Sequence, residues 1–218
     1  MLRRSRGHGL AQVEPDNETL RALAHHEAAH AVTAWALGTG TPSLKLSQEG
    51  WGRARYPDSQ GNIWRDWNLH GYEALGAERI EEEAIRLMAG PISEDYVTSG
   101  ASRKWSEYYL ENAEQLTQDL NSVFNDLMCA LDLLGGELDA PDGSTVAHLD
   151  AVQAKTEHIL RDAERWAAVE ALAERLFRRR YLRPSEVRST IRGAIRGQAR
   201  RRNRVGTVRA RKESERDE

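Results

Sequence analysis

Two histidines and a glutamate near the N-terminus form the most specific chemical pattern in the sequence. His26, Glu27 and His30 stand in the order H-E-x-x-H, within a segment whose apolar residues recur at helical spacing. Because residues four apart lie about 40° apart around a helix, both imidazoles leave from one face and can converge on one ion. Glu27 can then accept a proton from water at that ion. The pattern predicts a Zn²⁺ site with His26 and His30 as metal ligands and Glu27 as the catalytic residue; two histidines kept for packing are the alternative.

The third ligand decides the class of the site, and cysteine cannot supply it. The single cysteine, Cys129, cannot build a cysteine-based zinc site. Thr33 and Ala36 stand where the longer metzincin pattern needs glycine and histidine, so that subclass is excluded. A carboxylate from a later helix remains. The candidates are Glu78, Glu81, Glu82, Glu83, Glu94, Asp95, Asp119 and Asp126.

The residues around the motif resemble a known family of zinc proteases. The segment Ala24–Trp35 is similar to the active-site helix of FtsH-type peptidase domains, and Leu87–Ser102 is similar to that family's GGRAAEE segment and TGAS loop. The resemblance covers residues 20 to 127. It implies a zinc-dependent endopeptidase that hydrolyses peptide bonds in flexible or unfolded polypeptide, with a peptide or protein as its substrate.

The resemblance also bears on the third ligand. In the family this ligand is an aspartate directly after the TGAS loop, in an N-D-L or N-D-I context with an alanine a few residues on. In this sequence arginine, lysine and tryptophan follow the loop at positions 103 to 105. The resemblance therefore favours Asp119, which precedes Leu120, as the metal ligand; Asp126, Glu94 and the glutamates at 81 to 83 stay as alternatives.

Other features of the family are absent or different. FtsH-type proteases carry a membrane anchor and an ATPase module, and no G-x-x-x-x-G-K-[ST] sequence occurs here. We expect a stand-alone peptidase-like domain that uses no ATP. The resemblance further implies that an edge strand near residues 53 to 56 pairs with extended peptide. A catalytically silent peptidase-like binding or regulatory module is the alternative function.

The elements that position these residues are mostly helical. The pattern predicts a mainly α (α+β), zincin-like domain with a small β-sheet or hairpin near the active-site helix. The first helix is expected to be capped by Asp16 or Asn17 and to end at Gly38. Further helices are expected at residues 72–89, 105–134, 146–180 with a break near 163, and 184–196, with extended segments at 43–47 and 53–56. We expect a flexible lead-in at 1–15, the peptidase-like domain at 16–197 and a charged, disordered tail at 198–218.

Composition limits the remaining possibilities. The chain has 218 residues, 39% of them hydrophobic, and a net charge of −3, so it can bury a core. Its longest apolar run is about half of the roughly 20 residues that a membrane-spanning helix needs. We therefore predict a soluble, cytoplasmic protein. Acidic residues near the C-terminus weaken the field of the tail arginines, so nucleic acid is not an expected partner.

Overall fold

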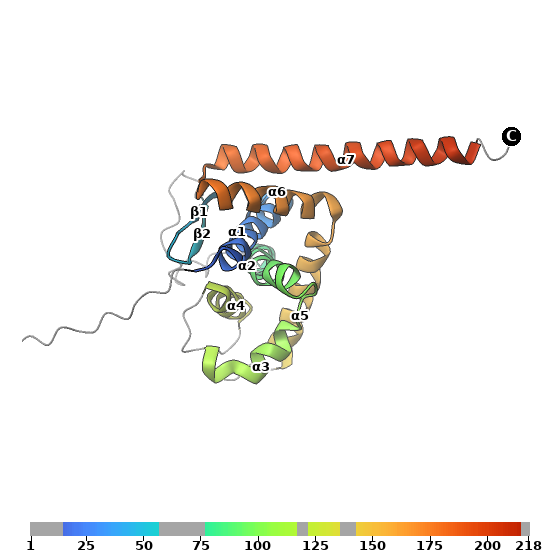
Figure 1. Ribbon diagram of the computed structural model, residues 1–218. Coiled ribbons are helices and arrows are strands. Elements are labelled where there is room, and N and C mark those ends of the chain that lie inside the picture. The colour runs from blue at the N-terminus through green and yellow to red at the C-terminus, as the bar shows by residue number, and fades with distance from the viewer. Residues whose placement is uncertain (1–14, 57–76, 117–121, 136–142, 215–218) are drawn as a thin grey trace, which may run out of the picture.

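The computed structural model describes residues 15–56, 77–116, 122–135 and 143–214. These residues form a mainly helical fold with one small antiparallel sheet, which confirms the predicted fold class (Figure 1). The helices are α1 (Asn17–Leu37), α2 (Ala77–Thr98), α3 (Trp105–Leu116), α4 (Ser122–Leu133), α5 (Gly143–Leu160), α6 (Ala163–Arg179) and α7 (Pro184–Ser214). The strands are β1 (Ser43–Leu46), β2 (Gly52–Arg55) and β3 (Tyr181–Leu182).

Helix α1 is the central element, and local signals set both of its ends. The side chain of Asp16 accepts a hydrogen bond from the backbone N–H of Thr19 at 2.8 Å and caps the first turn. Gly38 adopts a left-handed conformation, with φ of 76°, that a residue with a side chain rarely takes, and it closes the last turn. The expected first helix is confirmed, with Asp16 as its cap and Gly38 at its end.

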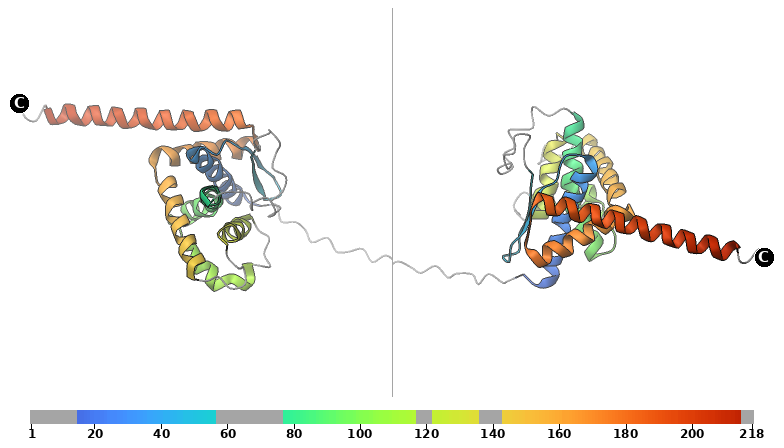
Figure 2. Two further views of the ribbon diagram at one scale, coloured as in Figure 1. Left: turned by 180° about the vertical axis from the view of Figure 1, so that it is seen from behind. Right: turned by 90° about the horizontal axis from the view of Figure 1, so that it is seen from above.

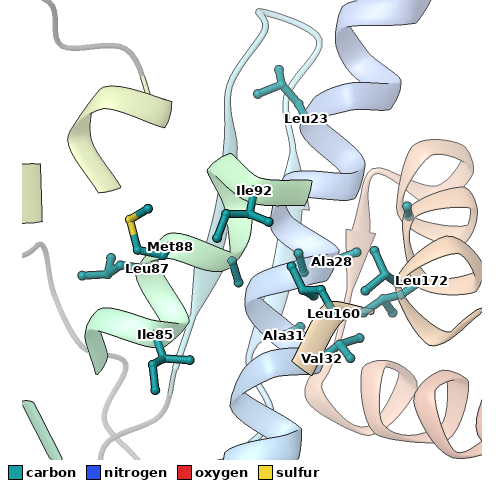
Figure 3. Packing of buried hydrophobic residues seen from close by; sticks show 14 of the residues in the cluster. Leu23, Ala28, Ala31, Val32, Ile85, Leu87, Met88, Ile92, Leu160 and Leu172 are labelled. Atoms are coloured by element: carbon teal, nitrogen blue, oxygen red, sulfur yellow. The ribbon is translucent and has the colours of Figure 1, made fainter. Parts of the chain in front are cut away.

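Alanines on α1 allow its neighbours to pack closely on two sides. Figure 3 shows Ala28, Ala31 and Val32 of α1 between side chains of α2, including Ile92, and Leu172 of α6. All of these side chains are buried. Their burial removes apolar surface from water and fixes α1 against α2, the pair of helices on which the candidate site is built.

The small sheet combines the predicted hairpin with a strand that the sequence did not indicate. Strand β1 pairs antiparallel with β2, with Ser43 opposite Arg55, and with β3, with Leu44 opposite Leu182. The strand order β2-β1-β3 leaves β2 at an edge. Strand β3 has only two residues, too few for an alternating pattern to reveal it.

Two helix boundaries differ from the sequence expectation. Gly90 and Pro91 were expected to end or kink the second helix, yet α2 continues through Pro91 to Thr98. Pro91 removes one backbone hydrogen bond, but Met88 and Ile92 on either side are fully buried, and their packing holds the helix together. The expected helix at 105–134 is two helices, α3 and α4; residues 117–121 between them lie outside the described residues.

The expected break near residue 163 is present. Helix α5 ends at Leu160, and Asp162 caps α6 by accepting hydrogen bonds from the backbone N–H groups of Glu164 and Arg165. An aspartate at this position satisfies donors that the first turn of a helix leaves unpaired. The cap therefore explains why one long apolar pattern forms two helices.

The segment expected to be a disordered tail continues α7 instead. Helix α7 runs from Pro184 to Ser214 and extends beyond the other helices (Figures 1 and 2). This segment is rich in arginine, which is a good helix former and favours continuation of the helix. Residues 1–14 of the expected lead-in and 215–218 lie outside the described residues. No helix in the described ranges has the length and apolar character that a membrane span requires.

Candidate metal centre

Two histidines of α1 and one aspartate of α4 bring three ligand atoms together. His26 and His30 lie one turn apart, and their Nε2 atoms are 3.0 Å from each other. Atom Oδ2 of Asp126 lies 2.8 Å from Nε2 of His26 and 3.0 Å from Nε2 of His30. Both histidines are buried, and Asp126 is partly buried. This group of three residues can hold a metal ion.

The other ring nitrogen of each histidine faces a hydrogen-bond acceptor. Nδ1 of His30 donates a hydrogen bond to the backbone carbonyl of Arg86 at 2.7 Å. Nδ1 of His26 lies 3.3 Å from Oε1 of Glu94, which is within ion-pair distance but does not have the geometry of a hydrogen bond. Metal-binding histidines commonly have such partners, because the partner fixes the ring and leaves the second nitrogen free for the metal. Glu94, a candidate ligand in the sequence, therefore lies behind His26, on the side of the ring away from Asp126.

The two Nε2 atoms and the carboxylate oxygen of Asp126 are all acceptors when the rings are neutral, so a cation stabilises the cluster. With both Nδ1 atoms facing acceptors, neutral rings direct their Nε2 lone pairs at each other and at a carboxylate. Burial lowers the pKa of His26, but the carboxylates of Asp126 and Glu94 outweigh it and raise that pKa well above its usual value. Burial raises the pKa of Asp126, but His30 and His26 outweigh it and hold that pKa well below its usual value. The cluster thus favours positive charge, as a proton or as a metal ion.

Gly90 leaves room beside the two imidazoles. A β-carbon at position 90 would stand 2.5 Å from Nε2 of His26 and 2.6 Å from Nε2 of His30. Both distances are shorter than any that a real β-carbon tolerates. From the sequence, Gly90 is a helix breaker and part of the segment that resembles the GGRAAEE segment, with no contact to the histidines predicted. In the fold, its missing side chain is what keeps a space open next to both nitrogen atoms.

Glu27 lies beside the cluster and is shielded from water by the sheet. Its side chain is buried, and a β-carbon at Gly52 of β2 would overlap its carboxylate, so the strand passes directly over it. Atom Oε2 of Glu27 has no hydrogen-bond partner in the described part of the chain. Burial raises the pKa of Glu27 to about 7, although His26 and His30 act in the opposite direction. A carboxylate with a pKa near neutrality can both accept and release a proton.

The remaining acidic candidates have other partners or lie elsewhere. Asp95 is buried and held by Arg103, whose Nη2 atom is 2.7 Å from Oδ1. Glu81 pairs with Lys155, and Glu83 pairs with Arg86. Among the described residues, the candidate metal cluster includes neither these side chains nor Glu78 and Glu82. Asp119, the ligand that the sequence favoured, lies outside the described residues.

A sequence signal for Asp126 was present but was given less weight. Asp126 stands in the order Asn125-Asp126-Leu127, with Ala130 following, and this matches the N-D-L context with a nearby alanine. Asp119 was preferred because it lies closer to the loop at residues 98–102. In the structure it is the later aspartate that contacts the histidines, because α4 packs against α2 and α2 lies beside α1.

Comparison with known proteins adds no family to this description. No protein-family model matches the chain, and no curated protein matches it. The resemblance to FtsH-type peptidase domains therefore rests on the motifs around His26 and on the loop at residues 98–102.

Proposed function

We propose that the protein is a zinc-dependent endopeptidase that hydrolyses peptide bonds in flexible or unfolded polypeptide. The observation that carries this proposal is the convergence of His26, His30 and Asp126 on one point, with the buried carboxylate of Glu27 beside it. Two imidazole nitrogens and one carboxylate oxygen are a ligand set of catalytic zinc sites, in which a fourth position stays open.

The chemistry of the donor atoms favours zinc over calcium and magnesium. Calcium and magnesium prefer sites built entirely from oxygen atoms, whereas imidazole nitrogen suits zinc. The space that Gly90 leaves beside both Nε2 atoms supports a bound ion at this place. A zinc ion held by these side chains supplies Lewis acidity, which polarises a peptide carbonyl and acidifies water.

The protein's own residues then perform the proton transfers. Glu27 takes a proton from the water molecule that attacks the carbonyl carbon. It passes this proton to the amide nitrogen as the C–N bond breaks, so that a carboxyl group and an amine leave. A pKa of about 7 suits Glu27 to both steps near neutral pH.

Strand β2 is the proposed docking site for the substrate. It lies at the edge of the sheet and passes over Glu27, with Arg53 and Arg55 exposed on it. An edge strand presents unpaired backbone groups with which an extended peptide can form hydrogen bonds. A peptide added there lies beside the catalytic carboxylate. This arrangement accepts flexible chains and excludes folded ones.

The test compares two glutamates of α1. Glu27→Gln should retain zinc but lower the rate of casein hydrolysis by about 10²- to 10⁴-fold, since the proton acceptor is lost. Glu18→Gln makes the same change of charge at an exposed position and should leave the rate unchanged. In the wild-type protein a chelator should stop hydrolysis and added zinc should restore it.

Two results would contradict the proposal. Equal rates for Glu27→Gln and the wild-type protein would show that Glu27 does not transfer the proton. A zinc-loaded wild-type protein that cleaves neither casein nor unfolded peptides would instead support a catalytically silent binding module. Zinc content, measured by mass spectrometry of the metal, separates this second outcome from simple loss of the ion.

A further inference from the structure

Helix α7 carries four exposed arginines in a regular row. Arg188, Arg192, Arg196 and Arg200, here called the arginine stripe, follow one another at intervals of four residues. In an α-helix this spacing places successive side chains about 6 Å apart along the axis and about 40° apart around it, so Arg188 and Arg200 differ by about 120°. The stripe therefore forms a gently winding row of positive charge on α7, whose C-terminal part projects from the fold (Figure 2).

The four side chains of the arginine stripe form no ion pair within the described part of the chain, although Glu186 and Glu164 pair with other arginines nearby. No ion pair joins any of its four side chains to a described residue, whereas Arg178 and Arg179 of the neighbouring helix α6 each pair with a glutamate. Like charges four residues apart destabilise a helix. An external anion with repeated charges would remove this repulsion. The stripe is thus an array of cations that lacks a partner inside the fold.

The charge of α7 contrasts with that of the whole chain. The helix contains nine arginines and one lysine against two glutamates, while the chain as a whole has a net charge of −3. Positive charge is therefore concentrated on one projecting element. The acidic residue nearest to the stripe on its C-terminal side is Glu213, about 20 Å from Arg200 along the helix. That separation exceeds the screening length of about 8 Å at physiological salt, so Glu213 does not neutralise the stripe.

We propose that the arginine stripe binds the phosphate backbone of a nucleic acid without reading its sequence. Duplex DNA carries one negative charge per roughly 1.7 Å of its axis, and arginine forms bidentate hydrogen bonds with phosphate. The four side chains of the stripe are exposed, so they can reach such a surface although this part of α7 packs against α6. The sequence argued against nucleic acid because acidic residues near the C-terminus weaken the field of the tail arginines. In the continuous helix the four arginines of the stripe lie well before those acidic residues, which changes that argument.

A membrane surface is a weaker match for the same charges. Helices that bind lipid headgroups add an apolar face that enters the bilayer. In α7 the apolar residues Val187 and Ile191 are buried against the rest of the protein. They cannot enter a bilayer while the helix is docked. The stripe therefore supplies positive charge but no apolar face that inserts into a bilayer. This combination suits a phosphate backbone.

Two triple variants of the full-length protein test this assignment. Arg192→Gln, Arg196→Gln and Arg200→Gln together remove three charges from the stripe. Their control combines changes to glutamine at Arg21, Arg161 and Arg178, three exposed arginines that already pair with glutamates. Both variants lower the net charge equally. Fluorescence anisotropy with a labelled 20-base-pair duplex of random sequence, from 50 to 200 mM NaCl, measures binding.

The wild-type protein should bind the duplex more weakly as salt rises. The stripe variant should bind at least about tenfold more weakly at 50 mM NaCl, and the slope of log K against log salt should become shallower by about 2 to 3, since each phosphate contact contributes about 0.9. The control variant should retain both values. A single-stranded RNA of 20 nucleotides, tested in parallel, shows which nucleic acid binds better. With either probe, a loss of affinity in the stripe variant but not in the control variant supports the proposal.

Three outcomes would overturn the proposal. The first is no binding of either probe by the wild-type protein at 50 mM NaCl. The second is an equal loss of affinity in both variants, because this would reflect net charge alone. The third is binding to vesicles that contain phosphatidylserine without binding to either nucleic acid. Circular dichroism of each variant verifies that its helix content is unchanged, and a variant that loses helix is replaced by Arg196→Gln alone.

Discussion

Gly90 of α2 lies so close to His30 of α1 that a β-carbon at position 90 would stand 2.6 Å from Nε2 of the imidazole. The same β-carbon would stand 2.5 Å from Nε2 of His26. The two helices therefore approach each other at the metal cluster with backbone alone on the α2 side. This contact makes glycine a requirement of the site.

Replacement of Gly90 should remove metal binding by filling that space. In Gly90→Ala the new methyl group competes with the ion for the volume beside both rings, so the purified protein should contain little zinc. Gly193→Ala is the matched control, because its β-carbon meets no atom within 4 Å. Metal content after dialysis against zinc gives the comparison. Full zinc occupancy in Gly90→Ala would show that the ion does not occupy this space.

Asp119 and Asp126 are both candidates for the third metal ligand in the sequence, and one substitution in each distinguishes them. Asp126→Asn removes the carboxylate that lies 2.8 Å from His26 and should weaken zinc binding by at least about 100-fold. Asp119→Asn should leave zinc affinity unchanged. Competition with a zinc-binding dye measures both affinities. The opposite pattern would restore Asp119 as the third ligand.

Removal of the ion should lower thermal stability. A ligand that binds only the folded state stabilises it by about 2.7 kcal/mol when present at 100 times its dissociation constant. For a protein of this size each kcal/mol shifts Tm by about 2–4 °C, so a chelator should lower Tm by roughly 5–10 °C. His30→Ala should melt at one temperature with or without chelator. His25→Ala should respond like the wild-type protein, since Nδ1 of His25 bonds to the backbone of its own helix.

Cys129 should react slowly with thiol reagents in the folded protein. It is partly buried on α4, and burial raises the pKa of its thiol to about 11. A raised pKa keeps the thiol protonated at pH 8, so its reaction with iodoacetamide should be about 100-fold slower than that of an exposed cysteine. The rate should rise about tenfold per pH unit between pH 8 and 10. Equal rates in the folded and guanidine-unfolded protein would mean that the packing of α4 against the rest of the fold does not cover this residue.

The parts of the fold that local chemistry specifies were predictable. Asp16 and Gly38 mark the two ends of α1, and the H-E-x-x-H spacing follows from the helix between them. The alternation around Leu44 and Leu46 indicated the hairpin, and both side chains are buried. Such signals act within one or two turns of a helix or along one strand, so they are visible without knowledge of the tertiary structure.

The parts that depend on tertiary packing were not predictable in the same way. Strand β3 exists because residues 181 and 182 pair with β1, and α2 continues past Pro91 because buried neighbours hold it. The choice between Asp119 and Asp126 depended on which turn of a later helix meets His26, and spacing alone does not determine that. Helix α7 has no apolar stripe beyond its first turns, so periodicity gave no sign of its full length.

The division of the ligands between α1 and α4 has a consequence during synthesis of the protein. His26 and His30 leave the ribosome about 100 residues before Asp126. Until the later segment has emerged and docked, the nascent chain offers only two of the three ligands and holds zinc weakly. Under the proposed function, hydrolysis is thereby withheld until the ligand set is complete, and the unfolded stretches of the growing polypeptide, the nearest available substrates, are spared.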